Sequence, residues 1–347
     1  MTGERGLAGA VDWEWAARAG VLLTRPGPST SRADAEAVVA DLSAAAVRAE
    51  GPVREVTGLA DGLPVPQARI VDRAGWITAA AASMAHLTGD DTAETGLLRG
   101  RPAGVQAGAV LAFLSSAILG QYDPFTGDHG TLLLVAPNVV GVERTLQVPP
   151  GDFRLWVCLH EVTHRVQFSS APWIAEYMRE TVATLGAVGD DSLTDLIGRL
   201  TTAVRDRQAG REQAPEDRGV VGLLRATQAE PQRAALDRLL MLGTLLEGHA
   251  DHVMDAVGPA VVPSVARIRR AFDQRRARRT NPVQRLLRAL LGIDAKMAQY
   301  VRGKAFVDAV VAEVGMSAFN TIWTGPDTLP STAEVDDPAK WIARVLA

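Results

Sequence analysis

The spacing of apolar positions along the chain predicts a mostly helical protein. Apolar residues recur every three to four positions over long stretches, which is the period of a helix with one buried face. Serine, aspartate and proline residues stand where several of these stretches begin, and they suit the first turn of a helix. The predicted helices cover residues 12–20, 31–50, 72–87, 172–185, 192–206, 231–257, 263–279, 282–291 and 295–314, with a last one after the Asp337–Pro338 cap.

Strand-forming sequence is scarce. Residues 131–135, TLLLV, are β-prone and are bounded by Gly130 and by the turn pair Pro137 and Asn138, which is typical of a strand. A weaker strand is predicted within residues 65–71. TLLLV is interpreted either as an edge strand that pairs with an extended substrate or, equally, as a core strand. The predicted fold class is therefore mainly α with a small β element.

The longest apolar stretch, residues 105–119, is too short to span a bilayer and is interrupted by Gln106, Ser115 and Ser116;. We therefore predict a buried helix there. The N-terminal residues include acids and tryptophans where a signal peptide would have an apolar run;. A net charge of −4 gives no whole-molecule attraction to nucleic acid or to an anionic membrane. We expect a cytoplasmic protein with neither partner.

Composition suits one globular protein with a sizeable core, because 47% of the 347 residues are hydrophobic and 22% are charged;. Cys158 is the single cysteine, which excludes an internal disulfide and fits a reducing compartment. The arginine-rich segment 267–279 is interpreted as a solvated helix face. Without an internal repeat or a long linker, we predict one domain over residues 1–347, with the core of a metal site within about 119–257.

The motif HEVTH, residues 160–164, indicates a zinc site. His160 and His164, four positions apart, project from one face of a helix and can bind one metal ion. Glu161 lies about 100° around the helix from His160, where it can act on a metal-bound water without being a ligand. Zinc lowers the pKa of that water, and a carboxylate can then take its proton as general base.

The helix that carries this motif is predicted to be buried. It begins at Asp152, a plausible N-cap, and runs to about Phe168;. Only a narrow strip with Arg154 and Arg165 suits solvent. Two apolar stripes flank this strip: Phe153, Trp156, Val157 and Phe168 beside the histidines, and Leu155, Leu159, Val162 and Val166 opposite. Buried histidines and a buried carboxylate need partners, and a metal ion would provide one.

A later helix offers the third ligand within LLEGHADH, residues 245–252. Glu247 falls on the same side as an apolar stripe, where an unpaired carboxylate would be costly and ligation by zinc would resolve that cost. Relative to Glu247, Asp251 lies roughly 40° around the helix, whereas His249 and His252 lie about 200° and 140° away. Asp251 could therefore bond the far nitrogen of a zinc-bound histidine.

Alternatives to Glu247 remain open. Glu247 could instead form a buried ion pair with an arginine, and Glu176, Glu180 and His249 are rival ligands. His252 could help to stabilise a developing oxyanion if its helix edge lines the cleft.

The segments HEVTHRVQF and EGHADHVMD, with LGQYDPF and LLLVAPNVV upstream, resemble an actinobacterial family of zincin-like hydrolases. One branch of that family is named for an association with the biosynthesis of the deazaflavin redox coenzyme. HExxH with a later ExxxD also resembles the gluzincin arrangement. The resemblance implies that His160, His164 and Glu247 are zinc ligands and that Glu161 is the general base. It also implies that Asp251 is a hydrogen-bond partner of a zinc-bound histidine. The 82 residues between His164 and Glu247 depart from the much shorter spacing of the best-known gluzincins.

The leading functional hypothesis is a zinc-dependent metallohydrolase, most simply a metallopeptidase that cleaves an amide bond in a peptide. A second hypothesis is a non-catalytic zinc protein, in which a structural site would fill the fourth position with another protein group. A third is a helical interaction protein that retains the fold without metal. Metal content and an open coordination position separate these hypotheses.

Overall fold

The computed structural model describes residues 11–89, 100–186, 230–277 and 293–347. The elements in chain order are α1 (Trp13–Leu23), α2 (Arg32–Thr57), β1 (Arg69–Val71), α3 (Arg73–Thr88), α4 (Arg101–Leu114), β2 (Gly120–Asp123), β3 (Thr131–Val135), α5 (Ala136–Leu146), α6 (Pro150–Ser170), α7 (Trp173–Gly186), α10 (Glu230–Val261), α11 (Val265–Ala277), α13 (Ile293–Phe319), η3 (Asn320–Trp323), η4 (Pro326–Thr328), α14 (Thr332–Asp336) and α15 (Pro338–Val345). The expected fold class, mainly α with a small β element, is confirmed.

Most predicted helices are present with somewhat different ends. The helix predicted at 31–50 continues to Thr57, and the long helix predicted at 231–257 continues to Val261 after a break at Gly258. The helices predicted at 192–206 and 282–291 lie outside the described residues. β2 and α5 were not predicted. Pro137 and Asn138 stand in the first turn of α5, because a proline there needs no hydrogen-bond partner for its nitrogen.

The sheet has the order β1–β3–β2. β1 and β3 are parallel, whereas β2 and β3 are antiparallel with Gly120 opposite Leu134. The TLLLV segment is thus the central strand, and the interpretation of it as an edge strand is wrong. Its alternate residues serve two cores, since Leu132 and Leu134 pack in one cluster and Leu133 and Val135 in another. A strand buried on both faces has a continuous apolar sequence.

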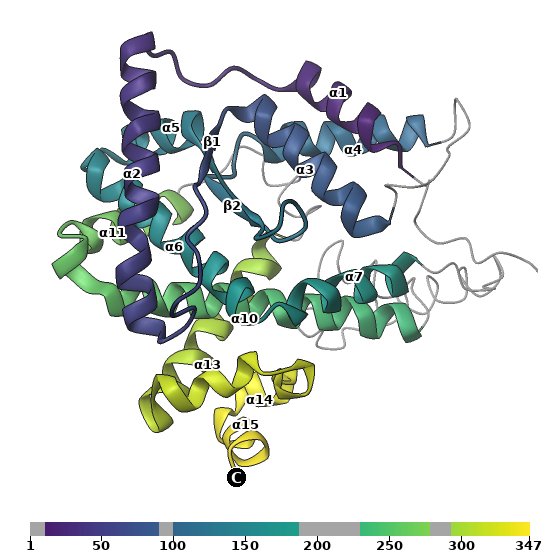
Figure 1. Ribbon diagram of the computed structural model, residues 1–347, viewed down its shortest axis with the longest axis vertical. Coiled ribbons are helices and arrows are strands. Elements are labelled where there is room, and N and C mark those ends of the chain that lie inside the picture. Colours follow the sequence, from purple (N-terminus) through teal and green to yellow (C-terminus); the bar gives the residue numbers. More distant parts are fainter. Residues whose placement is uncertain (1–10, 90–99, 187–229, 278–292) are drawn as a thin grey trace, which may run out of the picture.

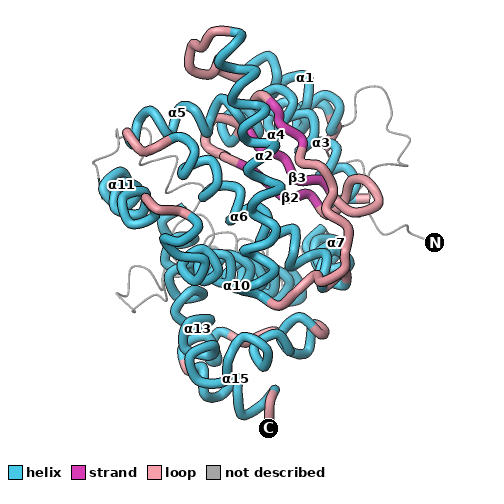
Figure 2. Tube along the Cα trace, turned by 60° about the vertical axis from the view of Figure 1, so that its left-hand side comes forward, coloured by secondary structure: helices cyan, strands magenta, loops and turns pink. Residues whose placement is uncertain are grey.

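Helix α10 lies across the middle of the molecule. In Figures 1 and 2 the sheet and helices α3 and α4 lie on one side of it, and the C-terminal helices α13 and α15 lie on the other. Helix α6 crosses between α10 and the sheet, packed against α2, β2 and α10. The HEVTH helix is therefore enclosed by helices on two sides and by strand β2 on a third.

The apolar stretch at 105–119 differs from its prediction. Helix α4 ends at Leu114. Its glycine side packs closely on α1: a Cβ added at Gly104 or Gly108 would lie 2.5 Å from the backbone oxygen of Asp12 or Ala16, respectively. The opposite side leaves Val105 and Val110 each 46% exposed. The expectation of a buried helix is wrong, because α1 and α3 cover only part of its surface and the side with Val105 and Val110 stays exposed in the described structure.

One further stretch, Arg302–Trp323, is long and apolar enough by composition to cross a membrane. The core helix of a soluble protein passes the same test, and here the stretch is broken at Gly315, which has a φ of 79°. Phe306, Val307 and Val310 within it pack in the core cluster shared with α10. The helix therefore has a packing role within the protein.

Candidate metal centre

Helix α6 places the HEVTH residues at the centre of the molecule. Pro150 begins the helix, one turn before the expected start. Asp152 consequently lies inside the first turn, where its carboxylate accepts a hydrogen bond from the backbone N–H of Ser264 at 2.8 Å. The expectation that Arg165 faces solvent is also wrong. Arg165 is 3% exposed and forms an ion pair with Glu50 of α2, because α2 covers the strip that the sequence left open.

The structure brings His160, His164 and Glu247 together. The Nε2 atoms of the two histidines are 3.2 Å apart, and the Glu247 carboxylate oxygens lie 3.4 Å from His160 Nε2 and 3.8 Å from His164 Nε2. Two ligands at about 2.0–2.1 Å from one tetrahedral zinc ion are about 3.3–3.4 Å apart. The two histidine nitrogens and the carboxylate oxygen nearest His160 lie at about this spacing, and two imidazoles with one carboxylate are a donor set that zinc commonly has.

Glu247 reaches this point from α10 and its side chain is 30% exposed. The buried surface of α10 is wider than the apolar stripe that was expected to surround Glu247. His249 is completely buried, although the helical geometry had turned it away from the core side. Helix α10 is buried on more than one face because α6, α7 and α13 all pack on it. Glu247 lies at the boundary, where a carboxylate can face a polar site.

The pKa values of the motif residues show how strongly these groups interact. Burial alone would lower the pKa of His160, but the hydrogen bond and the negative charge of Glu247 outweigh it and raise this pKa to about 9. Burial, followed by the repulsion of His160, lowers the pKa of His164. The negative charge of Glu247 thus favours a positive charge beside it, and a metal ion would bring such a charge.

Glu161 lies beside this group, and burial raises its pKa to about 7, against the opposing effect of His160. Its side chain packs on the backbone of strand β2. A Cβ at Gly120 would lie 2.6 Å from Glu161 Cγ and 3.0 Å from Oε1, so only glycine leaves room for the carboxylate in its present place. None of the described residues donates a hydrogen bond to that carboxylate. The oxygens that a general base needs are therefore available.

Asp251, one turn after Glu247, lies close enough for its charge to help raise the pKa of His160. The far nitrogen of His160, Nδ1, contacts Met254 Sδ at 3.3 Å. The backbone carbonyl of Asp251 accepts a hydrogen bond from the Arg269 guanidinium at 3.4 Å. A direct bond from His160 to the Asp251 carboxylate stays a prediction.

The rival ligands lie elsewhere. Glu176 forms an ion pair with Arg179 on the exposed side of α7, and Glu180 is exposed on the same helix. His249 is stacked on Phe319, with ring centroids 5.5 Å apart. His252 points to α13, where its Nδ1 lies 2.7 Å from an oxygen of Asp308. Within the described residues, the group of metal-binding side chains is His160, His164 and Glu247.

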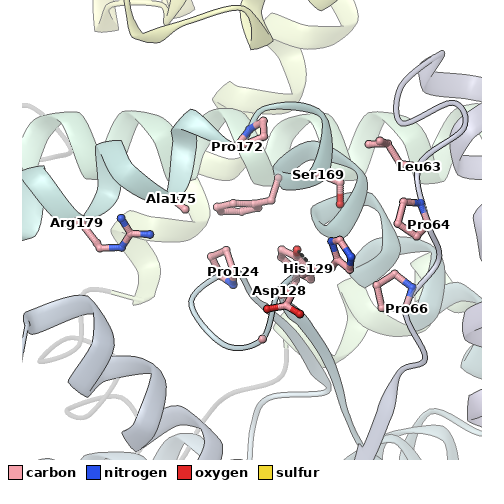
Figure 3. Close-up of a pocket in the computed structure, with 14 residues that line it drawn as sticks. Leu63, Pro64, Pro66, Pro124, Asp128, His129, Ser169, Pro172, Ala175 and Arg179 are labelled. Atoms are coloured by element: carbon pink, nitrogen blue, oxygen red, sulfur yellow. Dashed lines mark hydrogen bonds between the residues drawn. The ribbon is translucent and has the colours of Figure 1, made fainter. Parts of the chain in front are cut away.

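A hollow of about 350 Å³ opens one helical turn beyond His164. Phe168 forms part of its wall and lies about 6 Å further along α6;. Tyr122 of β2 packs on Phe168 with ring centroids 5.5 Å apart. Figure 3 shows Pro64 and Pro66 on one side of the hollow and Arg179 on the other, with the loop of Asp128 and His129 between them. Prolines and aromatic rings share its walls with the polar side chains of Asp128, His129 and Arg179, and such a mixed hollow can take a side chain of a substrate.

Sequence reasoning missed Gly120 and Gln167. Gly120 follows an apolar helix, and no local pattern shows which side chain it faces. Gln167 was not proposed as a site residue. Its place three residues after His164, on the same helix face, is the pattern that could have marked it as a partner of that histidine.

A buried helix with two histidines and a glutamate, completed by a glutamate from a second helix, defines the class of zincin-like metallohydrolases. A family model of zincin-like metallopeptidases matches residues 11–342. A crystal structure from Chloroflexus aurantiacus, described as a candidate hydrolase with a novel fold, is 30% identical. The match covers 96% of this chain and 98% of that one, with a TM-score of 0.66. No curated protein matches. The chain belongs to the zincin-like metallopeptidase family.

Proposed function

We propose that the protein is a zinc-dependent metallopeptidase in which His160, His164 and Glu247 hold the metal and Glu161 is the general base. The observation that carries this proposal is the convergence of the three donor atoms within 4.8 Å of one another. The shortest of these separations, 3.2 Å between the histidine nitrogens and 3.4 Å from His160 Nε2 to a Glu247 oxygen, are close to those around one tetrahedral ion. Membership of the zincin-like family implies zinc as the metal.

Bound zinc would supply an activated water and a positive charge that polarises the substrate carbonyl. The protein's own part is to position and to move a proton. The Glu161 carboxylate would accept the proton of the attacking water and pass it to the leaving amine. In the metal-free protein burial raises the pKa of this carboxyl, and a less acidic carboxyl accepts a proton more readily. Strand β2 holds the carboxylate in place through its contact with Gly120.

The proposed substrate is a peptide in extended conformation. Strand β2 lies at the edge of the sheet in the part of the chain that is described, and it passes from Glu161 at Gly120 to the wall of the hollow at Tyr122. An extended chain that adds to this edge would form main-chain hydrogen bonds and carry its amide bonds past Glu161. A side chain two to three residues further along would then enter the hollow.

The substitution Glu161→Gln tests the mechanism. Glutamine has nearly the same shape as glutamate, but its amide cannot take the proton. We expect unchanged zinc content and circular dichroism, with cleavage of a peptide library about 10²- to 10⁴-fold slower. Equal cleavage by both proteins at equal zinc loading would disprove the role of Glu161 and leave the metal site intact.

The non-catalytic alternative makes a different prediction for the same pair of proteins. A purely structural zinc site has no use for a base at position 161, so neither protein would cleave any member of the library. A cytoplasmic location and the association of the actinobacterial branch with deazaflavin coenzyme biosynthesis also belong to this proposal. Deletion of the gene followed by measurement of coenzyme content would test that association.

A further inference from the structure

Gln167 lies behind the metal centre, one turn after His164 on α6, and its side chain is completely buried. Its Oε1 atom lies 2.9 Å from His164 Nδ1. Its Nε2 atom lies 2.9 Å from the backbone oxygen of Leu246 and 2.9 Å from His249 Nδ1. The amide thus joins one proposed ligand on α6 to the α10 residue directly before the other proposed ligand, Glu247.

The Leu246 carbonyl fixes the orientation of this amide. A backbone oxygen accepts hydrogen bonds and donates none, so the NH₂ end of Gln167 must face it. The oxygen of Gln167 then faces His164 Nδ1, and this contact is a hydrogen bond only if Nδ1 carries the proton. His164 is thereby held with its N–H at Nδ1 and its lone pair at Nε2, the atom that faces His160 and Glu247.

His249 is the other end of the same chain of bonds. Because Gln167 donates to its Nδ1, the proton of the neutral ring is on Nε2. That atom is buried and has no hydrogen-bond partner among the described residues. The ring is neutral in this arrangement, because its Nδ1 accepts a hydrogen bond and therefore carries no proton;. A buried polar atom without a partner lowers the stability of the fold, and the hydrogen bonds that Gln167 forms with His249, Leu246 and His164 offset this loss.

We propose that Gln167 is a positioning residue that keeps His164 in the Nδ1–H tautomer. The Leu246 carbonyl fixes the orientation of the Gln167 amide by accepting its N–H. The inference rests on the proposed role of His164 as a metal ligand. In this arrangement α10 contributes twice to the centre. The side chain of Glu247 supplies a donor atom, and the carbonyl of the preceding residue sets which nitrogen of His164 is free to bind.

Three variants separate this role from a packing role. Gln167→Met is similar in size but accepts no bond from His164, and we expect zinc binding about 10- to 100-fold weaker. Gln167→Glu keeps an acceptor oxygen toward His164 and should lose far less zinc affinity, even if it places an oxygen opposite the Leu246 carbonyl and lowers stability. His249→Phe keeps an aromatic ring but leaves Leu246 to orient the amide, so its zinc affinity should equal that of the wild type.

Zinc dissociation constants from competition with a chelator, measured beside thermal unfolding of each metal-free protein, give the comparison. A packing role would make the loss of zinc affinity follow the loss of stability, and that result would overturn the proposal. Equal zinc affinity in Gln167→Met and the wild type would overturn it as well, while the metal site itself would stand. A wild-type protein that binds no zinc would instead refute the proposed function.

The tautomer can also be measured without any variant of Gln167. In ¹⁵N-histidine-labelled, metal-free protein, long-range ¹H–¹⁵N spectra distinguish a protonated Nδ1 from a protonated Nε2, and the His164→Ala spectrum identifies the signals of His164. We expect Nδ1–H for His164 and Nε2–H for His249. A His164 ring protonated at Nε2 alone would overturn the proposal, even if Gln167→Met did not fold.

Discussion

The side chains of α10 contribute to two groups of histidines and carboxylates. In the first, Glu247 meets His160 and His164 of α6, and the donor atoms face one another. In the second, about one turn further along, His252 bonds Asp308 of α13 at 2.7 Å. Lys304 forms ion pairs with Asp308 and, at 3.1 Å, with Asp255. The residue types are similar, but the second group includes its own cation.

The pKa values of the two groups reflect this difference. Burial would raise the pKa of Asp308, but its hydrogen bonds with Lys304 and His252 outweigh burial and lower it. In the first group the pKa of Glu161 is raised to about 7 and that of His160 to about 9. A carboxylate balanced by lysine is a structural ion pair, whereas strongly shifted and mutually facing groups in a partly open site are typical of function. The comparison predicts a metal at the first group and none at the second.

The largest expected effect is on zinc content. Purified protein should hold about one zinc per chain, and His160→Ala or His164→Ala should remove it, because a carboxylate with one histidine cannot hold the ion. The matched control is His252→Ala, which should keep full zinc content. Metal analysis by mass spectrometry gives the comparison. Full occupancy in a double variant of His160 and His164 would contradict the assignment of the site.

The next effect concerns the third ligand. Glu247→Ala should weaken zinc binding by more than about 100-fold, which is the upper end of the effects seen for residues that only hydrogen-bond to a metal ligand. Asp251→Ala should fall within about 10- to 100-fold. Asp308→Ala, Glu176→Ala and Glu180→Ala should leave the affinity unchanged. Zinc titration with a fluorescent chelator measures the ranking, and a larger loss in Glu176→Ala or Glu180→Ala would mean that α7 supplies the ligand.

A smaller effect is expected at the second group. Lys304→Met removes the cation that pairs with Asp255 and Asp308, whose side chains are each more than 40% exposed. Ion pairs with that much solvent contribute little, so the free energy of unfolding should fall by about 0.5–1 kcal/mol. Urea denaturation of the metal-free protein measures this change. Zinc affinity should be unaffected, and any loss would show that the two groups are coupled.

The smallest effect concerns pH. The pKa of Asp308 is lower in the folded protein than in the unfolded chain. Its contribution to stability is therefore complete above the unfolded pKa and is lost as the pH falls through the folded pKa. Asp308→Asn should reduce the loss of stability on the acid side. Urea denaturation of the variant and the wild type at pH 7 and in the acid range tests this, and an identical pH dependence would exclude the contribution.

Local patterns were enough to predict much of the site. His160, Glu161 and His164 lie within two turns of one helix, so their relative positions follow from helical geometry alone. Glu247 could be proposed because an acidic residue beside an apolar helix stripe needs a partner. The structure brings it to the histidines across 82 intervening residues. The family resemblance supplied the pairing of these two helices, which the spacing alone does not contain.

The wrong predictions concern contacts between distant segments. TLLLV has the same sequence whether it is central or at an edge, and its place depends on pairing with β1, about 60 residues earlier. Arg165 looked solvent-facing because Glu50, its partner, belongs to another helix. The role of Gln167 likewise depends on its hydrogen bond to Leu246, which lies on another helix. Each depends on which elements meet, and one sequence gives little information on that.

The central position of TLLLV has a consequence for how the chain misfolds. Residues 131–135 are apolar apart from Thr131, include the β-branched Thr131 and Val135, and carry no charge, proline or glycine, which resembles the composition of segments that stack into cross-β aggregates. In the native sheet both edges of this strand are occupied, by β1 and by β2. By pairing with both edges of β3, the two flanking strands keep this segment from pairing with another molecule. Both are short, which makes them poor templates for such pairing themselves. Until both strands have docked, the folding chain exposes that segment, and we expect a high concentration of unfolded chain to favour aggregation.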